Sequence, residues 1–343
     1  MRWRDRVCVI LSVGWVFVAA AGAIAAAPAT RPFGAAGPFE VATALVDFRD
    51  AGRDRVVPVK LYYPAGVAAT RPSPVILFSH GLGGTREAGE FLGKHWASHG
   101  YVTVHMQHAG SDADVWRGAT RPMEQMRKAA DARNAIARTG DVRFVLDELA
   151  RLDAGAADFP LKGRMDLTRV GMSGHSFGAV TTLAIAGRAP AILRVGGVSP
   201  VADPRVKAAV ALSPSPGAGD PATSFAAVRI PIFHMTGTRD VSPINDTKAA
   251  DRRVPFDHIK LADQYLLTLD GGDHAVFSGR RARGQAVATD AAHHELIRAG
   301  SLVFWDAYLK DDAGAKEWLA GAGGFTAAVG KAGTYERKRA AAN

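Results

Sequence analysis

The segment Arg169–Val180, with the sequence RVGMSGHSFGAV, gives the strongest indication of the fold of this 343-residue chain. A short strand-forming run, Arg169–Ser173, leads directly into Gly174–Gly178 (GHSFG), and small residues with helical character follow at Ala179–Ala186. A G-x-S-x-G sequence between a strand and a helix holds its serine on a sharp, strained turn, and its glycines let neighbouring backbone approach closely. The pattern therefore predicts that Ser176 is exposed at the carboxyl end of a strand, beside the N-terminus of a helix.

Before and after this turn, short apolar runs alternate with segments of helical spacing. The expected strands are two extended segments within 40–63, joined by a turn at 50–53, and runs at 74–79, 101–107, 206–212, 230–235 and 264–269. The expected helices cover 86–99, 141–152 and 292–310. Such an alternation predicts an α/β fold with a mostly parallel central sheet and helices on both faces. The tail at 322–343 is rich in glycine and alanine, and we expect it to fray.

Composition favours an ordinary globular protein, because hydrophobic residues make up 48% and charged residues 22% of the chain. The single cysteine, Cys8, excludes an internal disulfide. The formal net charge is +9, but the basic residues are scattered, which argues against nucleic acid as a partner. A basic surface would still favour transient contact with anionic surfaces. The oligomeric state is not predicted.

The first 27 residues have the pattern of a secretory signal peptide. Arg2, Arg4 and Arg6 precede an apolar run at 7–27, which ends in small residues before Pro28. We therefore expect a signal at 1–27, a single domain at 28–343, and a secreted or periplasmic protein. The alternative is an uncleaved membrane anchor, since the apolar run is long enough to span a bilayer.

A serine hydroxyl is a weak nucleophile and requires a general base. His274 is the strongest candidate, because it follows the last expected strand within a Gly-rich loop, Gly271–His274. The alternatives are His258, in an irregular stretch, and His293 and His294, which we expect to be solvated at a helix start.

The base in turn requires an acid that fixes its tautomer. Asp240 follows the strand at 230–235, and it lies between the serine and the histidine in the chain, which is the order expected in this architecture. Its rivals are Asp203, Asp220, Asp246 and Asp273. Asp273 is adjacent to His274 and cannot easily reach the ring.

Acyl transfer also needs hydrogen-bond donors directed at the developing oxyanion. The loop His80–Gly84 (HGLGG) follows an early strand, and we expect the backbone N–H groups of Leu82 and Phe177 to form an oxyanion hole. The alternative is a Gly-rich turn that only leads into a helix. A phosphate-binding loop is disfavoured, because neither G-x-G-x-x-G nor G-K-[ST] is present.

The segment 110–139 is long and polar but contains Trp116, Met123 and Met126. It could form a partial lid over the substrate site or simply pack as a surface loop. Trp116 is a candidate substrate contact, forming the acyl wall together with Leu82 and Phe177 in an open, shallow site. His108 and Asp112 lack a third ligand at a suitable spacing, so we expect no metal.

With Ser176, Asp240 and His274 in this order, the chain resembles the α/β-hydrolase superfamily over nearly all of 28–343. It is closer to a secreted bacterial branch similar to platelet-activating-factor acetylhydrolases, cutinase-like polyester hydrolases and predicted dienelactone hydrolases. The residues that carry the resemblance are 57–64 (VPVKLYYP), 78–81 (FSHG), 174–178 (GHSFG) and 271–274 (GGDH). The resemblance implies the α/β-hydrolase fold, a Ser-His-Asp triad, and neither metal nor cofactor. Dienelactone hydrolases use cysteine where this chain has Ser176, which favours ordinary ester hydrolysis.

Together these features predict a serine esterase that acts on small-molecule or polymeric esters, with short acyl groups preferred. An amidase or peptidase on the same scaffold, or a non-catalytic binding protein with a hydrolase fold, are the alternative hypotheses. The sequence does not identify the natural ester.

Overall fold

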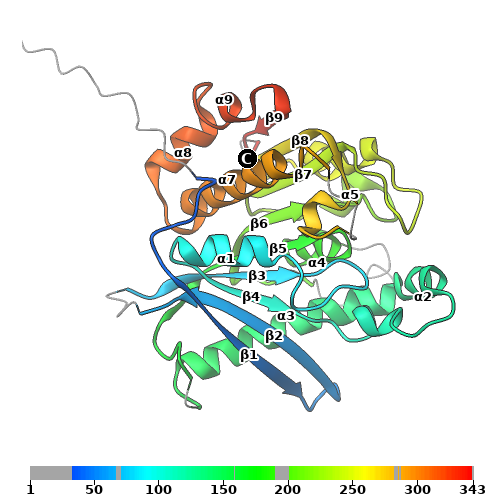
Figure 1. Ribbon diagram of the computed structural model, residues 1–343, viewed down its shortest axis with the longest axis vertical. Helices are drawn as coiled ribbons and strands as arrows, with labels where there is room; N and C mark the ends of the chain where they lie inside the picture. The colour runs from blue at the N-terminus through cyan, green and yellow to red at the C-terminus, as the bar shows by residue number, and fades with distance from the viewer. Residues whose placement is uncertain are drawn as a thin grey trace, which may run out of the picture. The chain divides into compact units, whose positions relative to one another are not determined.

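The computed structural model describes residues 33–66, 71–157, 159–189, 201–281, 285 and 287–341, and these belong to one compact unit that begins at Phe33. The expected signal at 1–27 lies outside the described residues. Figure 1 shows the course of the chain. The strands are β1 Val41–Asp50, β2 Arg55–Pro64, β3 Ser73–Ser79, β4 Val102–Met106, β5 Met165–His175, β6 Val206–Leu212, β7 Ile232–Arg239, β8 Gln264–Asp273 and β9 Gly333–Lys338. The α-helices are α1 Glu90–Ser98, α2 Pro122–Ala129, α3 Ala132–Asp153, α4 Phe177–Ile185, α5 Pro221–Phe225, α6 Val254–His258, α7 Asp290–Leu309, α8 Ala313–Ala320 and α9 Phe325–Val329.

The strands form one sheet in the order β1-β2-β4-β3-β5-β6-β7-β8-β9. The six strands from β4 to β8 in this order are parallel, whereas β1, β2 and β9 run antiparallel to their neighbours. The direction of strand addition reverses at β3, which lies between β4 and β5. Such a reversal leaves a crevice at the carboxyl ends of the strands, where α/β proteins place their sites. The arrangement confirms the predicted α/β-hydrolase fold.

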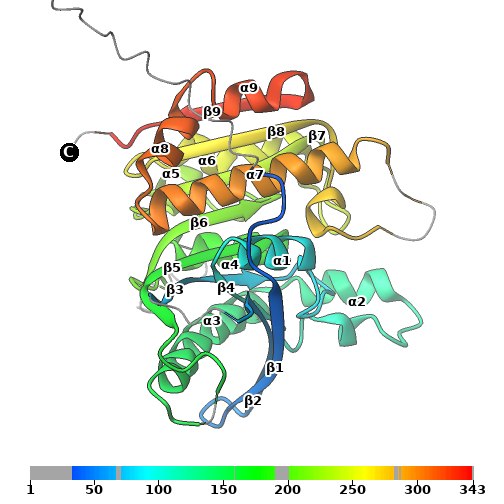
Figure 2. The same cartoon turned by 60° about the vertical axis from the view of Figure 1, so that its left-hand side comes forward.

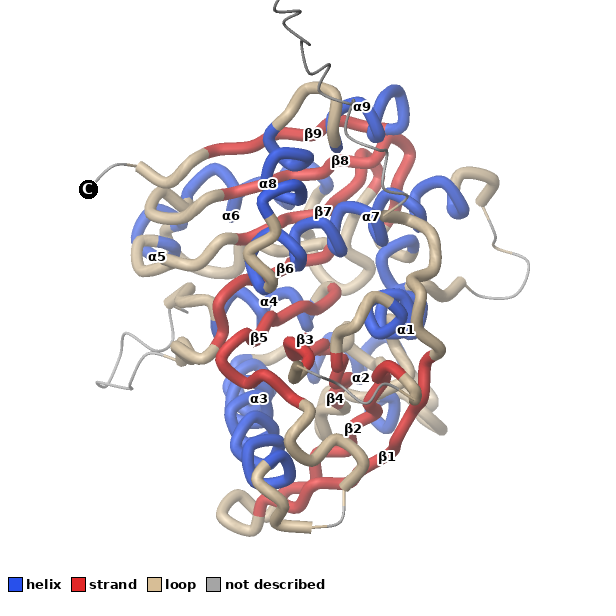
Figure 3. The backbone as a smooth tube through the Cα atoms, turned by 90° about the vertical axis from the view of Figure 1, so that its left-hand side faces the viewer, coloured by secondary structure: helices blue, strands red, loops and turns tan. Residues whose placement is uncertain are grey.

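Helices cover both faces of the sheet. Figures 2 and 3 show α1 and α7 on one face and α3, α4, α5 and α6 on the other. Among the described residues, no helix combines the length and the apolar character needed to cross a bilayer.

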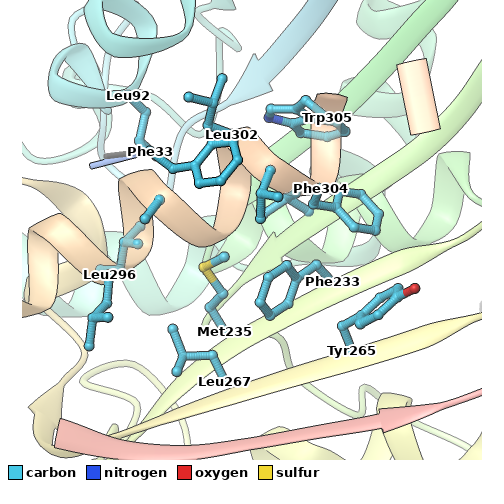
Figure 4. Packing of buried hydrophobic residues seen from close by; sticks show 14 of the residues in the cluster. Phe33, Leu92, Phe233, Met235, Tyr265, Leu267, Leu296, Leu302, Phe304 and Trp305 are labelled. Atoms are coloured by element: carbon cyan, nitrogen blue, oxygen red, sulfur yellow. The ribbon is translucent and has the colours of Figure 1, made fainter. Parts of the chain in front are cut away.

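The α7 face carries the most aromatic packing. Phe233 of β7 packs edge-on against Phe304 of α7, with ring centroids 5.8 Å apart, and Trp305 meets Trp96 of α1 at 90°. Figure 4 shows Phe233, Phe304 and Trp305 in this layer between α7 and the sheet. Complete burial of such large apolar side chains contributes about 1.5–3 kcal/mol each, so this layer anchors the strands whose ends carry the site.

The opposite face is packed by aliphatic side chains. α3, which includes the helix expected at 141–152, buries Val142, Val145, Leu146 and Leu149 against β2, β3 and β4. Small residues of α4 pack on β6 and β7, since Ala179 and Leu183 cluster with Ala209, Ala211 and Ile232.

Two boundaries differ from the sequence expectation. Helix α3 begins at Ala132, nine residues before the expected start at Asp141, because the Asp131 carboxylate caps it by accepting from Asn134 N at 2.7 Å. The tail was expected to fray after Gly321, and this prediction was wrong. Residues 325–338 form α9, a short 3-10 turn and β9, which pairs with β8 from Gln264–Lys338 to Leu269–Gly333. Phe325 is fully buried and packs against Phe233 and Tyr335, which fixes this end of the chain.

Candidate active site

Ser176 lies on a strained turn between β5 and α4. Its backbone has φ 56° and ψ −114°, and an L-residue pays a steric penalty at positive φ. The two glycines of the motif allow the turn to pack closely. A Cβ on Gly178 would lie 1.9 Å from the carbonyl oxygen of Ser79, and one on Gly174 would lie 2.4 Å from the carbonyl oxygen of Gly178. The G-x-S-x-G pattern therefore reflects a close backbone approach between β3 and the turn after β5.

Three of the predicted residues meet through their side chains. The hydroxyl of Ser176 lies 2.9 Å from Nε2 of His274, and Nδ1 of His274 lies 2.8 Å from Oδ1 of Asp240. These residues follow three different strands, β5, β7 and β8, and the parallel register brings the strand ends together. An ionised Asp240 can only accept, so Nδ1 carries the ring proton and Nε2 is free to accept from Ser176.

Asp240 is fully buried, and further donors hold its charged form. Ser213 donates to Oδ1 at 2.7 Å and Thr236 donates to Oδ2 at 2.9 Å. Burial alone would raise the pKa of Asp240, but the hydrogen bond from His274 and the charge of Arg252 outweigh it and lower this pKa below its ordinary value. The carboxylate is therefore ionised at neutral pH and can stabilise an imidazolium.

Arg252 connects the loops that follow β6 and β7. Its guanidinium donates to the carbonyls of Asp240, Ser213 and Pro214 at 3.1–3.2 Å, and it lies 3.4 Å from the Asp240 carboxylate. Because Arg252 is buried and reaches the loops after both β6 and β7, it fixes Asp240 relative to Ser213.

The predicted oxyanion loop lies beside the nucleophile. Ser79 at the end of β3 is paired with Gly174 of β5, so the following loop His80–Gly84 runs past Ser176. No hydrogen bond within the described part of the chain occupies the backbone N–H of Leu82 or that of Phe177, whereas Gly83 N donates to Ser111 O at 2.9 Å. Both predicted donors are therefore available to a ligand next to Ser176.

A buried polar network supports the oxyanion loop. The Arg138 guanidinium, fully buried, donates to the carbonyl of His80 at 2.6 Å and lies over the ring of Phe177 at 4.4 Å. It thus contacts both segments that carry the predicted oxyanion donors, the loop His80–Gly84 and the turn at Phe177. His80 adds a second tie, because its Nε2 accepts from the backbone N–H of His108 at 3.1 Å.

The same network contains a second Ser-His-Asp arrangement. His108 contacts Ser79 through Nε2 and Asp141 through Nδ1, both at 2.9 Å. All three side chains are fully buried, so an ester cannot reach the Ser79 hydroxyl, and the arrangement stabilises the loop. Arg53 and Arg55 complete the pairing of Asp141.

Two cavities meet at Ser176. The first has a volume of about 470 Å³ and is lined largely by apolar side chains of α3 and α4, together with Phe177. The second, of about 670 Å³, is lined by the oxyanion loop, His274, Trp116 and several charged side chains. Leu82, Ser176 and Ile244 line both cavities, so a substrate bound at Ser176 could extend into each.

Trp116 and Phe177 line different cavities. Its indole N–H donates to the carbonyl of Gly83 at 2.8 Å, and the side chain is 39% exposed on the His274 side. The expected acyl wall of Leu82, Phe177 and Trp116 is therefore not one surface. The expectation of a shallow site also needs correction, because α3 extends toward Ser176 and adds Ala135, Ile136 and Thr139 to the wall of the first cavity.

The segment 110–139 contributes to both cavities. Trp116 and Met126 border the second, and the residues after α2 border the first, while Met123 points to solvent with 42% exposure. Figure 1 shows α2 at the side of the molecule toward which β3 points.

The alternative acids have other partners or lie elsewhere. Asp273 accepts from Arg281, Asp203 accepts from Arg205, and Asp220 caps α5. Among the described residues, no hydrogen bond joins Asp246 to His274. Asp112 accepts from Gln107 at 2.8 Å, and the described residues contain no group of three metal-ligating side chains.

The alternative histidines are also engaged. His258 contacts the carbonyl of Val254 and His294 that of Val276, both at 2.9 Å. His293 is buried and His294 is half-buried against Phe91, so our expectation that both are solvated was wrong. Both residues lie near the N-terminus of α7, which packs on the core. This packing, rather than their polarity, determines how far they are buried.

Sequence reasoning missed Ser213, Arg252 and Arg138. Ser213 has φ 55° and lies at the end of β6, adjacent to the nucleophile strand. Its position after a buried strand was a usable signal, because strand ends in this fold carry functional side chains. The two arginines had no such signal, since nothing in their neighbouring sequence distinguishes a buried arginine from a solvated one.

A comparison with protein families gives one match, which covers part of the chain. Residues 58–129 match the model of the family described as platelet-activating factor acetylhydrolase, isoform II, and this segment includes β3 and the oxyanion loop. No curated protein matches the chain. The chain thus has an α/β-hydrolase fold, and over residues 58–129 it is similar to platelet-activating factor acetylhydrolase, isoform II, a family of that superfamily.

Proposed function

We propose that this protein is a serine esterase that cleaves carboxylic esters through an acyl-enzyme intermediate. The observation that carries the proposal is the hydrogen-bonded series Ser176–His274–Asp240 next to two unoccupied backbone donors. Nucleophile, base, acid and oxyanion donors are the parts that acyl transfer requires. The similarity to an acetylhydrolase family adds support for a hydrolase.

In the proposed mechanism each group has one step. His274 Nε2 accepts the proton of Ser176 as Oγ attacks the ester carbonyl, and the oxyanion accepts from Leu82 N and Phe177 N. His274 then protonates the leaving alkoxide, and Asp240 stabilises the transient imidazolium. Water, deprotonated by the same nitrogen, attacks the acyl-enzyme and releases the acid and Ser176.

The position of His274 supports a proposal for which part of the substrate occupies each cavity. A leaving alcohol must accept a proton from Nε2, so it occupies the cavity that His274 lines, together with Trp116. The acyl group then occupies the apolar cavity along α3 and α4. Under this assignment Trp116 contacts the alcohol portion of the substrate.

Among esters of straight-chain monocarboxylic acids, we expect short acyl groups to be preferred, from acetyl to about hexanoyl. Each buried CH₂ contributes only about 0.8 kcal/mol, and a long alkyl chain would meet the polar side chains Thr139, Ser215 and Arg188 that also line the acyl cavity. The measurement is kcat/KM for a series of p-nitrophenyl esters from two to sixteen carbons. A steady rise beyond dodecanoyl, or activation above the micellar limit, would contradict the expectation.

We also propose that the protein is exported, with the signal at 1–27 removed. The observation is the Arg-flanked apolar run, which ends in small residues. Mass spectrometry of protein from a periplasmic or culture fraction should give an N-terminus between about Ala26 and Thr30. Recovery of chains that begin at Met1 in the membrane fraction would support the anchor instead. Removal of 1–27 would lower the formal net charge from +9 by two, since it takes three arginines and one aspartate.

A further inference from the structure

Arg188 is a buried arginine in the wall of the acyl cavity. It lies just beyond the C-terminus of α4 and is only 4% exposed. Ser176 just before α4, Val180 and Ala184 on α4, and Arg188 just after the helix all line this cavity. Val180 and Ala184 lie one turn apart on the same face of α4, and the helix ends before Arg188, because Gly187 has φ 116°. The cavity therefore extends from the nucleophile at one end of α4 to Arg188 beyond the other end.

The guanidinium has unused hydrogen-bonding capacity. One terminal nitrogen donates to the carbonyl of Pro216 at 2.9 Å, and the guanidinium carbon lies 5.5 Å from the centre of the Phe225 ring. Its Nε has no hydrogen-bond partner among the described residues. A guanidinium offers five N–H donors, so a buried arginine with so few acceptors is poorly satisfied.

No carboxylate neutralises this charge within the described part of the chain. No salt bridge of Arg188 is found there, whereas Arg252, the buried arginine beside the triad, has an acidic partner in Asp240. Burial lowers the pKa of Arg188 below its ordinary value, and no charged group contributes to the shift. Asp131, which also borders the cavity, is exposed and caps α3. The undescribed residues 190–200 contain no acidic residue.

The wall is shaped around the guanidinium. Gly217 also lines the cavity, with φ 69°, and a Cβ at this position would lie 1.8 Å from a terminal nitrogen of Arg188. A side chain there would displace the guanidinium. The loop after β6 therefore accommodates Arg188 at the cavity without supplying a counter-ion.

We propose that Arg188 binds a carboxylate at the far end of the acyl group, so that monoesters of dicarboxylic acids are preferred substrates. This inference rests on the proposed esterase function and specifies its substrate class. A planar carboxylate can accept two parallel N–H bonds from a guanidinium, and such charge-assisted pairs are among the stronger hydrogen bonds. Hydrolysis breaks the ester bond at Ser176, water supplies the new carboxyl oxygen, and the distal carboxylate is unchanged.

The test compares esters matched in length and leaving group. The probes are monomethyl esters of dicarboxylic acids with four to ten carbons and methyl esters of straight-chain monocarboxylic acids of equal length, followed by proton release at constant pH. At the best length, we expect kcat/KM to be on the order of ten-fold or more higher for the dicarboxylic monoester. Arg188→Gln should reduce this ratio by a factor on the order of 10–100, and Arg188→Lys should retain part of it.

Arg229→Gln is the matched control, because Arg229 is exposed and lies outside the residues that line the acyl cavity. It removes the same charge and should leave the ratio unchanged. If Arg188→Gln does not fold, the wild-type ratio decides, together with competition by free dicarboxylates against monocarboxylates of equal length. Equal or better hydrolysis of the neutral ester by the wild type at every length would overturn the inference. Absence of hydrolysis of any ester would instead overturn the proposed function.

Discussion

Replacing Ser176 or His274 with alanine should lower kcat by a factor on the order of 10⁴–10⁶, because the members of a triad act as a unit. Within the described residues, Ser176 supplies the only hydroxyl that contacts Nε2 of His274. Asp240→Asn should cost less, since the amide preserves the packing but no longer stabilises the imidazolium. The measurement is single-turnover and steady-state hydrolysis of p-nitrophenyl acetate.

Ser173→Ala is the control for this series. Ser173 lies three residues before the nucleophile, and its hydroxyl is buried with no hydrogen-bond partner among the described residues. Its removal should leave kcat unchanged, and circular dichroism should show that every variant folds. Near-full activity in Asp240→Ala would mean that the acid is misassigned, and Asp203 and Asp246 would then be tested.

The free energy of unfolding should fall steeply as the pH decreases from about 6.5 toward 4. Burial lowers the pKa values of His105 and His234 from 6.5 to about 4 in each case. These rings are neutral in the folded chain but bind protons in the unfolded chain throughout this pH window. The unfolded state therefore binds more protons, and stability rises with pH there and is lost on acidification.

The expected effect is large, because each of these two shifts corresponds to about 3 kcal/mol at pH values below 4, and domains are stable by only about 5–15 kcal/mol. The measurement is urea unfolding at a series of pH values between 7 and 4. His105→Gln should flatten the dependence, since it removes one of the titrating rings. A stability that stays constant across this window would show that the buried histidines titrate as they do in the unfolded chain.

The sequence was sufficient for the features that depend on short, local patterns. The strand Val206–Leu212 was predicted to the residue, because an apolar run interrupted only by Lys207 and closed by a Ser-Pro turn has few other interpretations. Ser176, Asp240 and His274 could be selected because each follows a strand, and parallel strands end at the same edge of a sheet.

The remainder depends on contacts between distant segments. β9 has a charged sequence, Gly333–Lys338, and becomes a strand because β8 offers it an edge. Arg138 is buried because the carbonyl of His80 and the ring of Phe177 surround it, although these residues are far from it in the sequence. We predicted that Trp116 and Phe177 form one acyl wall, because both were expected near Ser176. In the structure they line two different cavities.

Labelling with a fluorophosphonate tests the central claim most directly, because the reagent forms a covalent adduct only with a serine that an adjacent base activates. The probe is applied to the wild type, Ser176→Ala and the control Ser173→Ala, and the adduct is located by peptide mass spectrometry. We predict one adduct, on Ser176, in the wild type and in Ser173→Ala, and none in Ser176→Ala. No labelling of the folded wild type, or an adduct that persists in Ser176→Ala, would contradict the assignment of Ser176 as the nucleophile.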